Sequence, residues 1–258
     1  MKKNISILML LLNVFFSVAQ NKTDEKGLKQ GYWKKTDPTT KKLIYEGSFK
    51  DNLPQDLFKY YYPNDSIKSK MLFIQNGKIG YSTLFHPNGK MMAYGKYINE
   101  LKDSTWSFYD EKGLIISKET FLLGKKNGIS VVYFSNGVVS EEYHYKMDLK
   151  HGTFKQYFDK NIVKGEGNYV NGLMDGKNTY YFPNGVQVAS GFYKNGQKNG
   201  PWIYKEQDGK IKEKELYKLG RLASQKETDN FFNKNKSTED KTKTVEPLQK
   251  QIKPKSGK

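Results

Sequence analysis

Aromatic and aliphatic residues recur along this chain every 24 residues, from residue 28 to residue 220. One extra residue in the first copy keeps the register, and the segment then divides into eight copies. A fixed period of this length is typical of repeat proteins, in which each unit is stabilised chiefly by packing on its neighbours. The predicted copies span residues 28–52, 53–76, 77–100, 101–124, 125–148, 149–172, 173–196 and 197–220.

The second half of each copy predicts a β-strand. An aliphatic residue there is followed six positions later by an aromatic one, and small residues such as Ala93 and Gly95 lie between them in several copies. Alternation with a period of two places these residues on one face of a strand. The aliphatic column holds Leu43, Ile67, Met91, Ile115, Val139, Val163 and Ile211, and is interrupted by Gln187. The aromatic column holds Phe49, Phe73, Tyr97, Phe121, Tyr145, Tyr169, Tyr193 and Tyr217.

The first half of each copy predicts another strand, because it carries further aromatic residues, which are enriched in strands. This second aromatic column holds Tyr61, Phe85, Tyr109, Tyr133, Tyr157 and Tyr181. It is preceded at a similar offset by Trp33, Phe58, Trp106, Phe154 and Trp202.

Turn residues separate the two strands of a copy, as in Pro87-Asn88-Gly89 and Pro183-Asn184-Gly185. Asn-Gly tolerates the positive φ of tight turns, so the two strands form a hairpin. Similar residues at the copy boundaries, such as Asn171-Gly172, predict a second antiparallel turn. The sequence therefore predicts an all-β protein, an elongated antiparallel β-meander of about eight tandem β-hairpin repeats and up to sixteen strands.

The repeat phrase resembles the bacterial variant of the MORN (membrane occupation and recognition nexus) repeat. The resemblance is carried by Tyr180-Tyr181-Phe182-Pro183-Asn184-Gly185, by Gly191 to Gly196, and by Gly200-Pro201-Trp202, and it covers residues 28–220. Copies two and four depart from the turn phrase, at Asp65 and at Glu111-Lys112. The resemblance implies a ribbon of β-hairpins used for protein or membrane contact, and it points to a bacterial group of YwqK-like antitoxin components.

Both ends of the chain differ from the repeats. Lys2-Lys3, a short apolar run over 5–16 and the Ser17-Val18-Ala19 exit predict a signal peptide at 1–19, because a spanning helix needs about 20 apolar residues. We therefore expect export to the periplasm, the outer-membrane surface or the medium. Residues 20–27 are a linker, and the polar, lysine-rich segment 221–258 predicts a disordered basic tail.

The net charge indicates which classes of partner are favoured, and the cysteine content excludes certain bonds and metal sites. The formal net charge is +17 and there is no cysteine, which excludes disulfides and thiolate zinc sites. A basic chain favours anionic partners such as acidic lipid or polysaccharide, although a merely solvated surface explains the charge equally well. Nucleic acid is the less favoured anion.

No catalytic, cofactor-binding or metal-binding residue is predicted. His86, His144 and His151 occupy different repeat positions without the spacing of metal ligands. No phosphate-binding glycine loop is present. The acidic residues in turns and at outward positions are scattered, and include Glu141, Glu142, Glu166, Asp175 and Asp208. An enzyme is therefore not expected.

The two aromatic columns remain as the candidate functional features. We assign the column from Phe49 to Tyr217 to the buried core, and the column from Tyr61 to Tyr181 to partner contact or to a second part of the core. The favoured function is a non-catalytic scaffold of the bacterial envelope that binds a protein or an envelope component. The alternatives are a YwqK-like antitoxin or immunity protein that neutralises a toxin, and a peripheral binder of anionic lipid.

Overall fold

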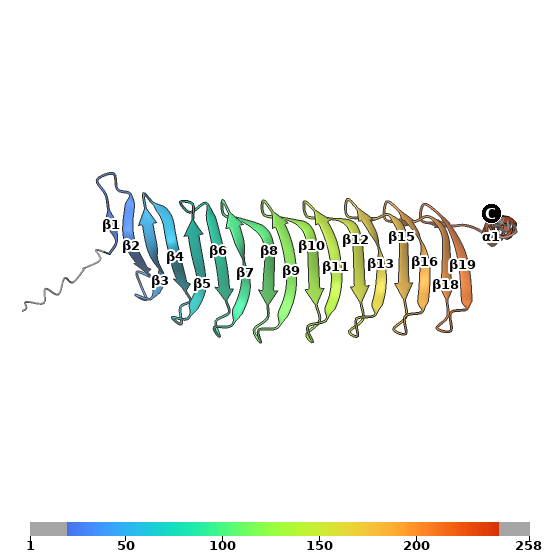
Figure 1. Cartoon of the computed structure of the whole chain (residues 1–258), viewed down its shortest axis with the longest axis horizontal. Coiled ribbons are helices and arrows are strands. Elements are labelled where there is room, and N and C mark those ends of the chain that lie inside the picture. Colours follow the sequence, from blue (N-terminus) through green and yellow to red (C-terminus); the bar gives the residue numbers. More distant parts are fainter. Residues whose placement is uncertain (1–19, 243–258) are drawn as a thin grey trace, which may run out of the picture. The chain divides into compact units, whose positions relative to one another are not determined.

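The computed structural model describes residues 20–242, so the predicted signal peptide and residues 243–258 lie outside the described residues. The chain divides into two units, one up to Lys125 and one from Lys126. In each unit successive strands pair antiparallel with their neighbours along the chain, as Figure 1 shows. The predicted all-β meander of hairpin repeats is confirmed.

The first unit contains nine strands in its described part. They are β1 (Lys22–Thr23), β2 (Lys29–Thr36), β3 (Leu43–Lys50), β4 (Leu53–Tyr61), β5 (Ile67–Ile74), β6 (Ile79–Phe85), β7 (Met91–Ile98), β8 (Leu101–Tyr109) and β9 (Ile115–Leu122).

The second unit continues the same pattern and ends in a helix. Its elements are β10 (Lys125–Tyr133), β11 (Val139–Lys146), β12 (Leu149–Tyr157), β13 (Val163–Val170), β14 (Leu173–Met174), β15 (Gly176–Tyr181), β16 (Gln187–Lys194), β17 (Gln197–Lys198), β18 (Gly200–Lys205), β19 (Ile211–Lys218), β20 (Arg221–Leu222) and α1 (Gln225–Thr242). β14 with β15, and β17 with β18, are single repeat strands interrupted at Asp175 and Asn199.

In copies two to eight, the turn inside the copy is closed by a backbone hydrogen bond between residues three apart, whose donor residue has a positive φ. In copy three the His86 N–H donates to the Lys90 carbonyl at 2.8 Å, and Gly89 has a φ of 83°. In copy two Asp65 takes the glycine position with a φ of 66°, and the Tyr62 N–H still donates to the Ser66 carbonyl. Aspartate tolerates this conformation better than most residues, so the departure from the turn phrase leaves the hairpin intact.

The turn that ends a copy is hydrogen-bonded to the start of that same copy. The Gly124 N–H donates to the Lys102 carbonyl at 2.9 Å in the first unit. The Gly172 and Gly220 N–H groups donate to the Lys150 and Lys198 carbonyls at 2.8 Å in the second unit. These bonds satisfy turn groups that would otherwise depend on water, and they repeat the same contact from copy to copy.

The segment after Gly220 corrects the prediction of a disordered tail within its described part, because it forms β20 and α1. Ser224 and Glu227 make a capping box: the Ser224 hydroxyl and N–H both donate to the Glu227 carboxylate at 3.0 Å. Thr228 is buried, and Lys214 lies over the Phe232 ring at 5.0 Å, so the helix packs beside β19. The Ser-x-x-Glu signal was present in the sequence, within a segment whose polarity favoured disorder.

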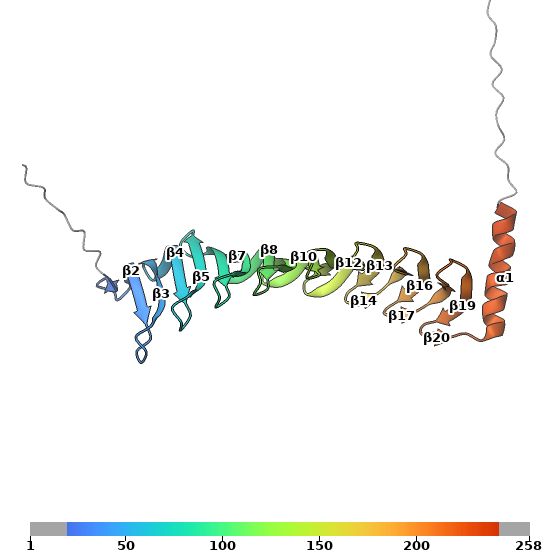
Figure 2. The same cartoon turned by 90° about the horizontal axis from the view of Figure 1, so that it is seen from below.

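Each unit is a single layer of sheet, as Figure 2 shows from below. Residues 20–125 form strands and turns only, so no other element of this segment covers either face of its sheet. The core must therefore be built by side chains packing along one face. We call this the inner face of each unit. It is defined by Trp33, Phe58 and Trp106 in the first unit, and by Phe154 and Trp202 in the second.

Candidate binding faces

The inner face holds the most deeply buried side chains. Trp106 is 0% exposed, Phe58 1% and Trp202 2%. They lie on the first strand of their copies, and the indole N–H groups of Trp106 and Trp202 donate to backbone carbonyls at 3.0 and 3.1 Å. The sequence shows this column but does not indicate whether it belongs to the core or to a binding site.

The predicted core column from Phe49 to Tyr217 lies on the same inner face. Phe121 is buried, and the other members are half-buried: Phe49, Phe73, Tyr97, Tyr145, Tyr169, Tyr193 and Tyr217. Several of these rings pack edge-on against the buried aromatics, with centroids 4.8 Å apart for Tyr97 and Trp106 and 5.0 Å apart for Phe49 and Phe58. This geometry favours the positive ring edge against the negative ring face.

Lysines at the start of several copies lie over these rings. The Lys102 ammonium lies 4.9, 4.8 and 5.0 Å from the ring centroids of Trp106, Phe108 and Phe121. Lys198 lies over Trp202, Tyr204 and Tyr217 in the same way, at 4.5 to 5.3 Å. These are cation–π distances, so each ammonium is attracted to the rings beneath it. The signal in the sequence was a lysine four residues before the buried aromatic.

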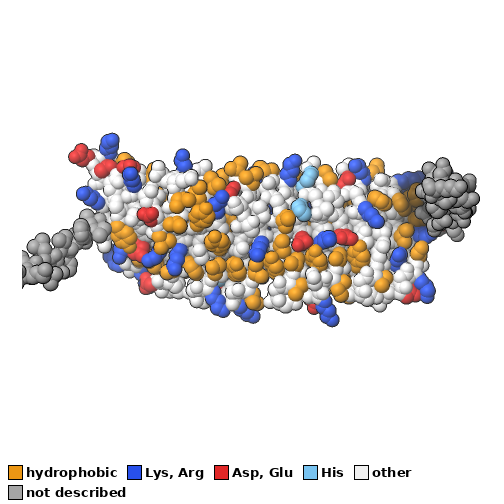
Figure 3. Space-filling view, in the orientation of Figure 1, with side chains coloured by type: hydrophobic (Ala, Val, Ile, Leu, Met, Phe, Trp, Pro, Cys, Tyr) orange, Lys and Arg blue, Asp and Glu red, His pale blue; other side chains and the backbone are white. Residues whose placement is uncertain are grey.

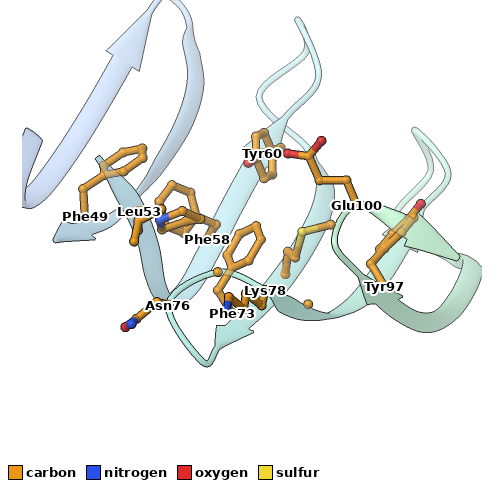
Figure 4. Close-up of a pocket in the computed structure, with 13 residues that line it drawn as sticks. Phe49, Leu53, Phe58, Tyr60, Phe73, Asn76, Lys78, Tyr97 and Glu100 are labelled. Carbon is orange, nitrogen blue, oxygen red and sulfur yellow. The ribbon is translucent and has the colours of Figure 1, made fainter. Parts of the chain in front are cut away.

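A pocket of about 540 Å³ opens on the inner face of copy two. Phe58, Tyr60 and Phe73 line it, together with Met71 and Glu100, and Figure 4 shows the Glu100 carboxylate directed towards the aromatic side chains. Phe58 and Tyr60 are stacked with centroids 6.3 Å apart, and Phe58 meets Phe73 edge-on at 5.3 Å. The pocket therefore combines aromatic surface with a carboxylate.

The opposite face, which we call the outer face, carries the column chosen for partner contact. Its members Tyr61, Phe85, Tyr109, Tyr133, Tyr157 and Tyr181 are all half-buried. The Tyr61, Tyr157 and Tyr181 hydroxyls donate to carboxylates 15 residues upstream, at 2.7, 3.1 and 2.8 Å. The accepting residues are Glu46, Glu142 and Glu166. Three side chains of this column are thus held in place by hydrogen bonds within the sheet.

Glu46 is the most strongly perturbed acid of the outer face. It is 14% exposed, and hydrogen bonds from Tyr32 and Tyr61 together with Lys59 hold the pKa of its carboxyl at about 2, below the usual 4.5. Burial and the same carboxylate raise the pKa values of Tyr32 and Tyr61 to about 12. These groups form a compact network that requires an ionised Glu46.

This network predicts acid sensitivity in the first unit. A carboxyl with a depressed folded pKa stabilises the fold above its unfolded pKa, and this contribution is lost as the pH falls from about 4.5 towards 2. The free energy of unfolding of Glu46→Gln should therefore fall less than that of the parent protein between about pH 5 and about pH 2. Urea unfolding at a series of pH values measures this. Glu111→Gln, which removes an exposed turn acid, is the control, and equal pH slopes for parent and Glu46→Gln would contradict the assignment.

Large apolar side chains form a contiguous patch on the outer face of the first unit. Leu57 pairs with Leu72 and Leu72 with Tyr81, while Ile79 pairs with both Ile74 and Ile98, and Ile98 pairs with Leu101. Paired residues share a face, so these seven side chains lie together. Five are 39–46% exposed: Leu57, Leu72, Ile74, Tyr81 and Leu101. Figure 3 shows hydrophobic side chains at the surface of both units. We call the seven residues the apolar patch.

The histidines and scattered carboxylates have ordinary structural partners. His86 Nε2 lies 2.9 Å from the Tyr109 carbonyl oxygen, and His144 Nδ1 lies 2.9 Å from that of Thr153. His151 Nδ1 accepts from the Asn171 N–H at 3.4 Å. Glu141 accepts from Gln156, while Asp175 and Asp208 pair with Lys194 and Lys210. Within residues 20–242, no group of three potential ligands comes together to hold a metal ion.

The one helix among the described residues is too polar to cross a membrane.

Comparison with known families and proteins bears on the repeat alone. A family model described as the MORN repeat variant matches residues 57–75, 126–147 and 150–171. The comparison with curated proteins found no similar sequence. The three matched segments fall within copies two, five and six, so the predicted resemblance to the MORN variant is supported in those copies.

Proposed function

We propose that this chain is a non-catalytic scaffold of the bacterial envelope that binds a protein partner through the apolar patch. The observation that carries this proposal is a group of seven apolar side chains in hydrogen-bonded register on one face of a single-layer sheet, five of them exposed. Soluble proteins rarely leave such a patch uncovered unless it serves an interaction. MORN-type repeats are binding modules, which fits the same reading.

The surroundings of the patch favour a protein as the partner. Lys59 pairs with Lys70 on the strands beside it, and Lys96 pairs with Tyr81 within the same row. Lys96 also bridges to Asp103 at 3.1 Å. An apolar centre with a charged border is the usual arrangement of a protein interface.

The second unit offers a natural comparison. At the repeat positions of Leu57, Leu72 and Tyr81, it carries Thr153, Asn168 and Lys177. The repeat itself therefore does not require apolar residues there. The envelope location rests on the signal-peptide pattern of residues 1–19.

The test is affinity capture from native envelope extract with residues 20–258. Ile98→Gln with Leu101→Gln should abolish recovery of the partner, because the glutamines place polar groups in the apolar patch. The matched control is Val170→Gln with Leu173→Gln, at the same repeat positions of the second unit. Retention of the partner by the first double variant would refute the use of the patch. Recovery of a single stoichiometric partner that is a toxin would favour an immunity protein over a scaffold.

Anionic lipid is the second candidate, favoured by the +17 charge and by neighbouring Lys59 and Lys70 on the outer face. Lysines attract the chain to acidic headgroups while apolar side chains enter the interface. Vesicles with and without phosphatidylserine test this by co-sedimentation. Binding that requires the acidic lipid and is released by salt would favour the lipid over the protein partner.

A further inference from the structure

Two copies of the inner face show how this repeat binds a cation. In copy four the Lys102 ammonium lies about equally far from three rings, Trp106, Phe108 and Phe121. In copy eight Lys198 has the same relation to Trp202, Tyr204 and Tyr217. Each cage of three rings is thus filled by a lysine from its own copy.

Copy two builds the same cage without the lysine. Phe58, Tyr60 and Phe73 lie 48 residues before the three rings of copy four, and Pro54 stands at the position of Lys102. The Pro54 ring packs closely on Gly77 in the next turn. Proline carries no ammonium, so the cage of copy two lacks its internal cation.

The pocket of about 540 Å³ is found at this cage. Its lining also includes Tyr97 and the Glu100 carboxylate, which supplies negative charge beside the rings (Figure 4). Lys78 also lines the pocket, and its ammonium can form an ion pair with an anionic group of the same ligand. Three rings and a carboxylate are the chemistry that recognises an organic cation.

We propose that the pocket of copy two binds a quaternary ammonium group, in the place where copies four and eight hold their own lysine. A quaternary ammonium suits a free ligand better than a primary one, because it has no N–H groups whose hydration must be replaced. The three methyl groups contact the rings, and Glu100 balances the charge. This site lies on the inner face and does not depend on the partner proposed for the outer face.

The test is a titration of residues 20–258 with choline, followed by calorimetry and by chemical shifts of the pocket residues. We expect saturable binding at millimolar or lower concentration. The neutral isostere 3,3-dimethyl-1-butanol should bind about tenfold more weakly, since it lacks the charge. Equal affinity for the two probes would show an apolar pocket instead of a cation site.

Pro54→Lys is the decisive variant, because it restores the lysine that other copies carry at this position. It should fold like the parent and lose choline binding, since its own ammonium occupies the cage. Glu100→Gln should weaken binding several-fold. Met174→Lys is the matched control: it adds the same charge at the equivalent position of copy seven and should leave choline binding unchanged. Absence of saturable choline binding by the parent protein, or undiminished binding by Pro54→Lys, would overturn the proposal. Neither outcome affects the capture of a protein partner through the apolar patch, which is tested by different variants.

Discussion

Replacing Trp106 by alanine should lower the free energy of unfolding by about 3–5 kcal/mol. The indole is 0% exposed and meets Tyr97 edge-on at 4.8 Å. Its N–H donates to the Lys96 carbonyl, and Lys102 lies over its face. Alanine therefore leaves a cavity, removes the indole donor from the Lys96 carbonyl, and removes one of the three rings beneath the Lys102 ammonium.

Urea unfolding followed by circular dichroism measures this loss, and hydrogen exchange locates it. In a repeat array the loss should be largest in copies three and four, because each copy is stabilised by its neighbours. Tyr94→Ala is the control: Tyr94 is 48% exposed on the outer face, and its removal should change stability by less than about 1 kcal/mol. Similar losses for the two variants would contradict the placing of the core on the inner face.

Adding one methyl group at Gly95 should destabilise the first unit by about 1–3 kcal/mol. A Cβ at this position would overlap the Trp106 ring, which lies flat against the glycine backbone. The backbone of Gly95 does not need a positive φ, so the effect measures the close approach of the ring alone.

The control for Gly95→Ala is Gly80→Ala on the neighbouring strand. A Cβ at Gly80 would meet the Met71 side chain at 3.4 Å, an ordinary contact, so that variant should be nearly neutral. In a Trp106→Ala background the cost of Gly95→Ala should almost disappear, because the ring it strikes is gone. Additive losses in this double-mutant cycle would mean that Gly95 is required for another reason.

The repeat period, the strands and both turns could be predicted because each depends on residues close in sequence. Pro87-Asn88-Gly89 specifies its turn locally, and the alternation through Ala93 and Gly95 specifies a strand. The depth of burial could not be predicted in the same way. Trp106 and Tyr109 lie on the same strand and are both aromatic, and only the pairing with β7 and β9 shows which of them lies on the inner face.

The candidate sites depend still more on register. The apolar patch joins Leu57, Leu72 and Tyr81, whose relation appears only when three strands are paired residue by residue. The lysine cages could not be predicted from the sequence, because they depend on the contact of Lys102 with rings on two different strands. From sequence alone, these lysines contributed only to a net charge. Pro54 became informative because the neighbouring copies show what it replaces.

The backbone bonds between successive turns bear on how such a chain is made and altered. The Gly124 N–H donates to the Lys102 carbonyl and the Gly172 N–H to the Lys150 carbonyl, so each of these bonds closes within one copy. Such a β protein has contacts that are short in sequence, which speeds folding relative to sandwiches and barrels of similar size. Copies can be added in order as the chain is synthesised. A gene duplication of 24 codons would lengthen the sheet while every existing contact kept its partner.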